Sequence, residues 1–345
     1  MQKLMLFRFS AMGDVAMTVP VVKVLSDSYP TTEIIVVSRP FFAPLFKGIP
    51  RVKFVGVDLK NKYKGIGGLY RLFKELKREQ PDVIADLHDV LRTKVLRTFF
   101  RLSGYKIAVI DKGRKEKKAL TRFPNKVLKP LKTTHERYAD VLRQLGFELD
   151  LEQYQPVLPE LSPQVQLFLQ HFEGQKLVGI APFAAHAGKE YPEEKTGEVI
   201  RLLLEKDPDI NILLFGGGAS EKQRLDKLEK IDRNRIVNLA GVFSFEEELQ
   251  IISRLDVMMS MDSGNGHLAA IYGVPVVSVW GATHPHAGFA PFKQPVENQI
   301  IPDLERFPQL PTSVYGNKTF EGFEKVWETI PPETITGKIL NNLPA

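Results

Sequence analysis

The sequence predicts an α/β protein made of two doubly wound domains, each with a parallel sheet and helices on both faces. The chain has 345 residues, and a domain usually contains roughly 100–200. Short β-rich apolar runs alternate with longer amphipathic stretches, which is typical of strands alternating with helices. The segment 156–163 contains three prolines and little periodicity, so we expect the boundary between the domains there.

The first domain is expected to span residues 1–155. Apolar runs predict its strands, which are Lys3–Phe9, Glu33–Val37, Val52–Val57, Asp82–Leu87 and Lys106–Ile110. Apolar residues at helical spacing predict a helix over Leu69–Glu79. A second helix is expected over Val15–Asp27, with its start or a kink near Pro20. A third is expected over His135–Leu145, closed by Gly146.

The second domain is expected to span residues 156–318, and it repeats the alternation more clearly. The expected strands are Leu177–Ala181, Asn211–Phe215, Val257–Met261 and Val276–Trp280. The expected helices are Glu193–Glu205, Ser220–Ile231, Phe245–Arg254 and Gly264–Tyr272. A helical tail is expected over 319–345, interrupted at Pro331 and Pro332, and packing back on the N-terminal domain is one option for it. Because ligands of such sheets bind at the carboxyl ends of the strands, we expect a cleft lined by strand-to-helix loops.

Composition narrows the class of protein. The chain has no cysteine, which excludes disulfides, zinc–thiolate sites, iron–sulfur clusters and cysteine nucleophiles. No apolar run reaches the roughly 18–20 residues that span a bilayer, and Arg8 and Asp14 interrupt the apolar N-terminus too early for a signal peptide. We therefore expect a soluble protein, attached at most to a membrane surface.

The net charge of +6 is unevenly distributed. Residues 1–156 hold 30 Lys and Arg against 16 Asp and Glu, a charge of +14, and residues 157–345 hold 17 against 25, a charge of −8. The basic half therefore suits an anionic partner, such as nucleic acid, an anionic lipid surface or a phosphorylated sugar. An uneven distribution of solvated charge is the alternative. One dense basic run contains Lys112, Arg114, Lys115, Lys117 and Lys118, with Arg122 nearby; it is either a binding loop or a solvated segment.

The loop Ser10–Asp14 directly follows the first expected strand. Gly13 allows a tight turn or a close approach by a ligand. Asp14 then lies near a helix start, where it is either a helix cap or a catalytic base. One glycine is too few for a dinucleotide-binding fingerprint.

The loop Asp262–His267 joins an expected strand to an expected helix. N–H groups at a helix start suit a diphosphate, Gly264 and Gly266 allow close approach, and Ser263 and His267 can add hydrogen bonds. Asp262 suits a sugar hydroxyl. These small and polar residues favour ligand binding over a capped turn with a satisfied histidine.

Two further loops carry candidate ligand-binding residues. Three glycines, Gly216–Gly218, precede Glu221, which could accept hydrogen bonds from ribose hydroxyls or favour the first turn of its helix. The loop is not a P-loop, because the closing Gly-Lys-Ser/Thr is absent. Lys189, in the sequence Lys189-Glu190-Tyr191-Pro192, could reach a phosphate as a point charge; a surface lysine is the alternative.

Together these motifs resemble the glycosyltransferase family 9 heptosyltransferases. The resemblance covers most of the chain in the expected order. Lys189–Pro192 is similar to the family's Lys-x-Trp-Pro element. The other matching segments are Phe7–Asp14 with Pro20, Asn238–Gly241, Asp262–Gly264 with His267, and Gly273–Pro275 through Gly281–Pro285.

The resemblance implies a GT-B fold with two Rossmann-like domains facing a cleft. It implies an inverting, metal-independent transferase of lipopolysaccharide biosynthesis in a Gram-negative bacterium, working in the cytoplasm, with peripheral attachment to the inner membrane as an option. The implied donor is ADP-heptose, bound by the C-terminal domain. The implied acceptor, bound by the N-terminal domain, is the anionic inner core with Kdo or heptose, a glycolipid at the inner membrane face. No cofactor is implied.

By resemblance, Asp14 matches the catalytic base. The donor-binding positions are Lys189, Glu221, Asp262, Ser263, Gly264 and His267. For the acceptor we expect Ser10, Gly13, Lys62, Lys64 and Arg92. We expect no metal site, because the spacing of Asp86 and Asp89 differs from the Asp-x-Asp motif of metal-dependent sugar transferases.

The sequence departs from the family pattern in the loop before Lys189. Ala184 and Ala185 stand where hydroxyl side chains would help to hold a diphosphate, which keeps a different nucleotide sugar and a different cell-surface glycan open as substrates. A nucleotide-sugar epimerase of the same fold is another alternative, and it would draw on His186, His284 and His286. A noncatalytic nucleotide or glycolipid binder is a fourth. Nucleic acid is not an expected partner, because no recognition helix or aromatic–basic platform accompanies the charge.

Overall fold

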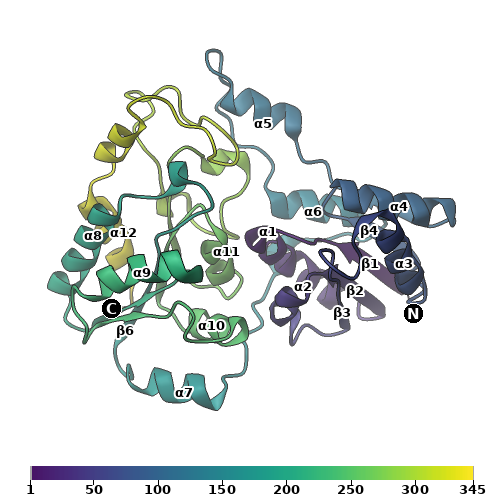
Figure 1. Cartoon of the computed structure of the whole chain (residues 1–345), viewed down its shortest axis with the longest axis horizontal. Helices are drawn as coiled ribbons and strands as arrows, with labels where there is room; N and C mark the ends of the chain where they lie inside the picture. Colours follow the sequence, from purple (N-terminus) through teal and green to yellow (C-terminus); the bar gives the residue numbers. More distant parts are fainter. Residues whose placement is uncertain (1, 345) are drawn as a thin grey trace. The chain divides into compact units, whose positions relative to one another are not determined.

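The computed structural model describes residues 2–344, and Figure 1 shows the chain coloured along the sequence. The chain divides into two compact units. The first contains Met1–Lys112 and Thr134–Val157, and the second contains Gly113–Thr133 and Leu158–Ala345. The main change of unit therefore falls at Val157, inside the proline-rich segment 156–163.

The first unit is built on a five-stranded parallel sheet with the order β3-β2-β1-β4-β5. Since β1 pairs with both β2 and β4, the chain changes direction across the sheet at β1, and the loops after β1 and β4 lie side by side at the carboxyl edge. Such a switch point is where open α/β sheets bind ligands. The strands are β1 (Gln2–Phe7), β2 (Thr32–Ser38), β3 (Val52–Gly56), β4 (Val83–Asp86) and β5 (Lys106–Val109).

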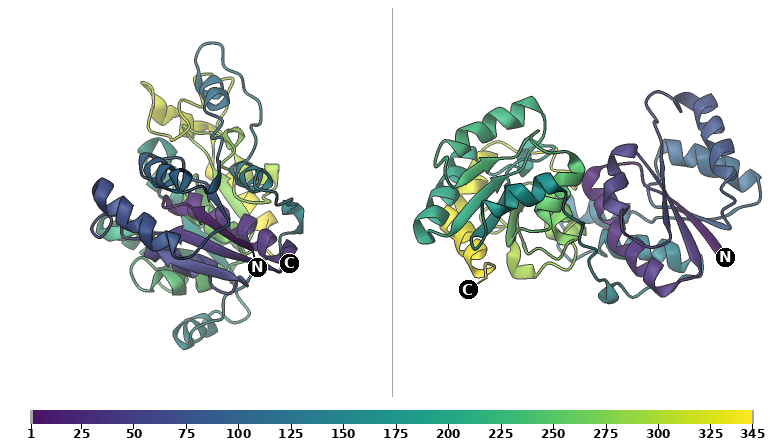
Figure 2. Two further views of the ribbon diagram at one scale, coloured as in Figure 1. Left: turned by 90° about the vertical axis from the view of Figure 1, so that its right-hand side faces the viewer. Right: turned by 90° about the horizontal axis from the view of Figure 1, so that it is seen from below.

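Helices cover both faces of this sheet (Figure 2). Alternate residues of the strands point to opposite faces, so Met5 and Phe7 of β1 pack with Leu72 and Phe73 of α3 and Phe100 of α4. On the other face α2 contacts β2, and α6 contacts β4 and β5. The helices are α1 (Met12–Ala16), α2 (Thr18–Ser28), α3 (Gly65–Lys77), α4 (Leu91–Leu102) and α6 (Thr134–Arg143), with 3-10 turns η1 (Pro40–Phe46) and η2 (Leu151–Gln153).

The second unit is built on a six-stranded parallel sheet with the order β11-β10-β9-β6-β7-β8. Its central strands are buried and rich in Val, Ile, Leu and Met, as expected for a sheet covered on both faces. The loops after β6, β9 and β10 share the carboxyl edge. The strands are β6 (Lys176–Ala181), β7 (Ile210–Leu214), β8 (Ile236–Asn238), β9 (Val257–Met261), β10 (Val276–Val279) and β11 (Gln299–Ile300).

The helices of the second unit include a C-terminal one that packs on α8 and contacts β9 and β10. The α-helices are α5 (Arg114–Thr121), α7 (Pro163–Gln170), α8 (Glu193–Lys206), α9 (Gly218–Glu229), α10 (Phe245–Ile252), α11 (Gly264–Ala270) and α12 (Pro332–Asn341). The 3-10 turns are η3 (Ala187–Lys189), η4 (Pro285–Ala287), η5 (Val296–Asn298) and η6 (Phe323–Thr329).

The predicted fold class, two α/β units each built on a parallel sheet, is confirmed, and the details differ at identifiable points. The helix expected over Val15–Asp27 is two helices, α1 and α2. The basic run forms α5, which groups with the second unit rather than the first. The tail from 319 onward also groups with the second unit. Within residues 2–344, no helix is long and apolar enough to cross a membrane.

Candidate functional site

The first group of candidate residues lies where β1 and β4 end. Phe7 is in register with Asp86, so the residues that follow the two strands are neighbours. Asp14 is the third residue of α1, and its Oδ2 accepts a hydrogen bond from the backbone N–H of Ala11 at 3.1 Å. Arg8 donates from Nη2 to the same oxygen at 2.6 Å. Asp14 therefore both supports the start of α1, through the Ala11 N–H, and forms an ion pair with Arg8.

Arg8 fixes this carboxylate from a buried position. Its Nη1 donates to the carbonyl oxygen of Leu87 at 2.9 Å, and its guanidinium carbon lies 5.8 Å from the centre of the Tyr138 ring. The Tyr138 hydroxyl donates to the backbone oxygen of Asp14 at 3.3 Å. Both contacts of the Asp14 carboxylate fall on Oδ2. Among residues 2–344 none is recorded on Oδ1, and the side chain is 29% exposed, so one oxygen is held and the other can face a substrate.

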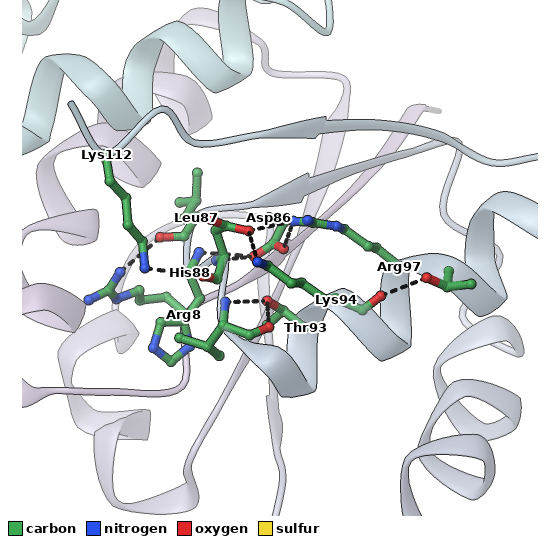
Figure 3. Close-up of polar contacts among 11 residues, drawn as sticks. Arg8, Asp86, Leu87, His88, Thr93, Lys94, Arg97 and Lys112 are labelled. Atoms are coloured by element: carbon green, nitrogen blue, oxygen red, sulfur yellow. Dashed lines mark hydrogen bonds and ion pairs between the residues drawn. The ribbon is translucent and has the colours of Figure 1, made fainter. Parts of the chain in front are cut away.

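His88 completes the surroundings of Arg8 (Figure 3). Its Nδ1 accepts a hydrogen bond from the Phe9 N–H at 3.3 Å, which leaves the ring proton on Nε2. Burial, helped by the positive charges of Arg8 and Lys112, lowers the pKa of His88 to about 3. The imidazole is therefore neutral at physiological pH and presents an N–H donor beside the Arg8–Asp14 pair.

The two aspartates of the β4 loop hold the loop together. Asp86 is fully buried, and its Oδ2 pairs with Nη1 of Arg97 at 2.8 Å. Its Oδ1 accepts from the backbone N–H groups of His88 and Asp89 at 3.0 and 2.9 Å. Asp89 shares the same Arg97 nitrogen at 3.0 Å. In the described part of the chain, no group of three or more His, Asp or Glu residues could hold a metal ion.

The expected acceptor residues lie at different distances from this centre along the sheet edge. Ser10 and Gly13 belong to the loop after β1 and to α1, beside Asp14. Arg92 is exposed at the start of α4, one strand away. Lys62 and Lys64 follow β3, the edge strand. The Nζ of Lys62 pairs with Glu75 of α3 at 3.0 Å, so this lysine is engaged at the α3 side of the unit.

The second group of candidate residues belongs to the second unit. Val279 of β10 is in register with Met261 of β9, which brings the loops after these strands together. Lys189 Nζ lies 3.0 Å from Oδ2 of Asp262, and the two side chains are only 13% and 8% exposed. Thr283 donates from Oγ1 to the same carboxylate oxygen at 2.7 Å. These three residues form a cluster that we call the Lys189 cluster.

Close backbone packing fixes the position of Lys189. Gly188 accepts a hydrogen bond from the Ala282 N–H at 2.7 Å, and a Cβ on Gly188 would lie 2.8 Å from the Gly316 oxygen. Gly316 has a φ of +75°, and a Cβ there would lie 2.2 Å from Cγ of Lys189. The alkyl chain of the lysine thus passes over a position that only glycine fills without a clash.

Arg224 ties the loop after β6 to α9. Its Nη1 pairs with Oε2 of Glu190 at 3.1 Å and its Nε with Glu193 at 2.9 Å. Its guanidinium carbon lies 4.1 Å from the centre of the Phe183 ring. Glu190 in turn accepts from the N–H of Ala184 at 3.2 Å through Oε1. The carboxylate of Glu190 therefore binds the backbone of this loop at Ala184.

Glu221 and the loop before α11 are held by contacts within the second unit. Oε2 of Glu221 accepts from the N–H of Gly217 at 2.7 Å, so it supports the start of α9. Ser263 precedes α11 and contacts Ser260 through the two hydroxyls at 3.1 Å. The N–H of Gly266 donates to Ser260 Oγ at 3.1 Å. Packing onto β9 therefore accounts for Gly266, for which the sequence predicted a close approach by a ligand.

The remaining donor candidates lie within α11 itself. Gly264 begins the helix, and His267 is buried in it. His284, a candidate of the epimerase alternative, is also buried; burial and the neighbouring His286 lower its pKa to about 4. Its Nδ1 accepts from the His286 N–H at 3.1 Å, so these two histidines organise η4.

Sequence reasoning did not single out Arg8, His88, Tyr138, Thr283 and Arg224. Arg8, His88 and Thr283 carry a signal that could have found them. Each is a polar residue within a few positions of the carboxyl end of a buried strand, at the edge where ligands bind. Tyr138 and Arg224 lie within helices, and only the fold brings them to the loops.

Comparisons with known proteins identify the family of the chain. Residues 69–312, about seven tenths of the chain, match the model of glycosyltransferase family 9 (heptosyltransferase). The lipopolysaccharide core heptosyltransferase OpsX of Haemophilus influenzae is 25% identical over 295 residues, which cover 82% of this chain and 80% of that protein.

Two solved structures share the fold along nearly the whole chain. The glycosyl transferase family 9 protein from Veillonella parvula superposes with a TM-score of 0.74 at 19% identity, covering 99% of this chain and 97% of that one. The E. coli heptosyltransferase WaaC, solved with ADP, superposes with a TM-score of 0.68 at 20% identity, covering 99% and 100%. The family match and the parallel-sheet fold lead to one conclusion: the chain belongs to glycosyltransferase family 9, the heptosyltransferase family.

Proposed function

We propose that this protein transfers heptose from ADP-heptose to the inner core of lipopolysaccharide, with inversion at the anomeric carbon and without a metal ion. The names of the relatives support the reaction class and the pathway. The observation that supports binding of the nucleotide-sugar donor is the Lys189 cluster. It holds a nearly buried ammonium group at the carboxyl edge of the second sheet. The match to a transferase family favours transfer over the epimerase alternative.

In the proposed reaction, Asp14 is the base. An acceptor hydroxyl attacks the anomeric carbon of heptose and gives its proton to Asp14, while the bond between that carbon and the diphosphate oxygen breaks and ADP leaves. A single displacement inverts the configuration. The open Oδ1 of Asp14 supports this role, since Arg8 and the Ala11 N–H hold only Oδ2. A positioned base contributes roughly 10²–10⁴-fold to the rate.

Lys189 is proposed to stabilise the leaving diphosphate. Without donor, its ammonium is paired with Asp262 at 3.0 Å, so the charge is held in place rather than free in solvent. An ammonium that is already oriented needs little reorganisation when the phosphate charge develops. Backbone N–H groups at Ser263 and Gly264 are proposed as further donors, since the first N–H groups of a helix lack intrahelical acceptors. Glu221 and His267 are proposed to contact the ribose or sugar.

The acceptor is proposed to be an anionic glycolipid at the inner membrane face, with the enzyme on the cytoplasmic side. With the segment 113–133 assigned to the second unit, the first unit holds 22 Lys and Arg against 15 Asp and Glu, a charge of +7, which supports an anionic acceptor. Ser10 and Gly13 lie beside the proposed base, and Arg92 lies one strand away along the same edge. Lys62 and Lys64 are proposed to bind more distant anionic groups.

Calorimetric titration of the protein with ADP, ADP-heptose, UDP-sugars and GDP-sugars tests the donor. We expect binding of the two ADP compounds and a loss of about 10–100-fold in their affinity in Lys189→Met, because one charge-assisted contact contributes about 1.5–3 kcal/mol. Lys206→Met, at an exposed position in the same unit, is the matched control and should bind normally. Preference for UDP- or GDP-sugars would overturn the heptose donor and leave the transferase class intact.

A further inference from the structure

We propose that the segment Gly113–Thr133, which we call the basic arm, docks the protein on an anionic lipid bilayer. The arm contains α5 and the chain that returns from it, and the loop after α5 projects from the ribbon (Figures 1 and 2). This inference deepens the proposed function, whose acceptor lies at a membrane face, by naming the surface that meets the bilayer; its test requires neither donor nor sugar acceptor.

The arm is anchored at its base to the second unit. The N–H of Leu131 donates to the His286 oxygen at 3.0 Å. Lys126 Nζ donates to the Pro308 oxygen at 2.9 Å and also to the Leu310 oxygen. Lys117 Nζ lies 4.0 Å from the centre of the Phe289 ring. These contacts hold the arm against the second unit, and the other side chains of the arm are left to make contacts elsewhere.

The arm carries a dense positive charge. It contains eight Lys and Arg residues and one Glu, a net charge of +7 over 21 residues. Four of the basic side chains are exposed and have no ion pair recorded among the described residues: Lys115, Lys118, Arg122 and Lys129. Because no carboxylate neutralises them, their charge is available to an anionic surface.

Apolar side chains are exposed among these charges at the tip. Phe123 is 56% exposed, Val127 45% and Leu128 39%. The N–H of Val127 donates to the carbonyl oxygen of Ala119 at 3.1 Å, so the returning chain is held against the end of α5. All three residues belong to this short turn, within positions 123–128. Apolar side chains that are exposed close together are typical of an interaction site.

The combination of charge and apolar tip indicates a bilayer surface. Basic residues are attracted to anionic headgroups, and apolar side chains can enter the boundary between headgroups and acyl chains. Charge alone would suit a polyanion such as RNA. The exposed apolar side chains favour a bilayer instead, because a bilayer offers them apolar surroundings and the phosphates of RNA do not.

Sedimentation with phosphatidylcholine vesicles, with and without phosphatidylglycerol, tests the proposal. The full-length protein should bind only the vesicles that contain phosphatidylglycerol, and less as salt rises. Neutralising one basic residue near such a surface costs about fivefold in partitioning. The triple variant Lys118→Gln, Arg122→Gln, Lys129→Gln should therefore partition about 100-fold less strongly.

A second triple variant provides a control of equal charge change. Lys206→Gln, Lys230→Gln, Arg233→Gln alters exposed residues elsewhere on the second unit, and it should bind the vesicles nearly as the wild type does. An equal loss of vesicle binding in both triple variants would mean that only the overall charge matters, and it would overturn the proposal that the basic arm is the docking surface. The absence of wild-type binding to the anionic vesicles would overturn it as well.

The apolar contribution is tested by Phe123→Ser, with Leu167→Ser on α7 as its control, since Leu167 is also well exposed. Phe123→Ser should weaken binding severalfold, and Leu167→Ser should not. If Phe123→Ser binds normally while single-stranded RNA competes fully with the vesicles, the arm binds polyanions and the bilayer proposal fails. Turnover on a water-soluble acceptor fragment should be unchanged in the arm triple, so a failure here is separate from a failure of the proposed function.

Discussion

Replacing Arg8 with methionine should damage both the stability of the first unit and the geometry of Asp14. The change removes the 2.6 Å contact to Asp14 and the 2.9 Å contact to the Leu87 carbonyl oxygen. A hydrogen bond to a charged group contributes about 1.5–3 kcal/mol. Because Asp14 is partly exposed and water can replace its partner, we expect about 2–4 kcal/mol of destabilisation rather than the sum of two full contacts.

The assay combines denaturant unfolding with steady-state kinetics. In Arg8→Met we expect kcat to fall about 10–100-fold, because a small misplacement of a catalytic group has effects of this size, while the KM for the donor changes little. Arg97→Met is the control: it unpairs the buried Asp86, and breaking a buried pair costs about 3–5 kcal/mol, yet kcat of the folded protein should be retained. Normal kcat in Arg8→Met would refute the positioning role.

Three further predictions concern the surroundings of the two sites. Thr283→Val removes the 2.7 Å hydrogen bond to Asp262; calorimetry should show ADP affinity lowered about 3–10-fold, roughly what one ordinary hydrogen bond contributes, and unchanged affinity would contradict the Lys189 cluster. Gly316→Ala places a Cβ 2.2 Å from Cγ of Lys189; it should weaken ADP binding and lower the melting temperature, and a neutral effect would contradict the close packing. The pKa of His88 is lowered from 6.5 to about 3, so the unfolded chain takes up a proton as pH falls through this window, the folded chain does not, and folding stability is lost. Between about pH 7 and pH 5, the free energy of unfolding of His88→Asn, measured by urea titration, should therefore fall by about 2 kcal/mol less than that of the wild type. An equal fall in both proteins would show that His88 does not titrate in this way.

The sequence was sufficient for the fold because alternating strands and helices leave few arrangements. The loops of the site could be found for the same reason, since strand ends in a parallel sheet share one edge. The pairing of Asp14 with Arg8 could not be predicted, because Arg8 stands between two buried phenylalanines and its side chain meets Asp14 only once α1 has turned back. Its contact to Leu87 depends on the register of β1 with β4.

The basic arm shows a second feature that could not be predicted from the sequence. The run 112–118 has almost no apolar periodicity, so nothing in its pattern predicts a helix, yet Arg, Lys, Glu, Ala and Leu all have high helix propensity and α5 forms over Arg114–Thr121. The buried Leu120 supplies a contact that pattern analysis could not weigh. Grouping of the arm with the second unit depends on partners near residues 286 and 310, which are distant in sequence.

The most direct test of the account is the turnover of Asp14→Asn, measured with ADP-heptose and an inner-core acceptor alongside calorimetric titration with ADP. Asparagine can still accept from the Ala11 N–H but cannot take a proton from the acceptor. We predict that kcat falls about 10²–10⁴-fold, while ADP affinity stays within about twofold of the wild type, because Lys189 and the rest of the donor site are unchanged. Turnover near the wild-type rate would contradict the assignment of Asp14 as the base.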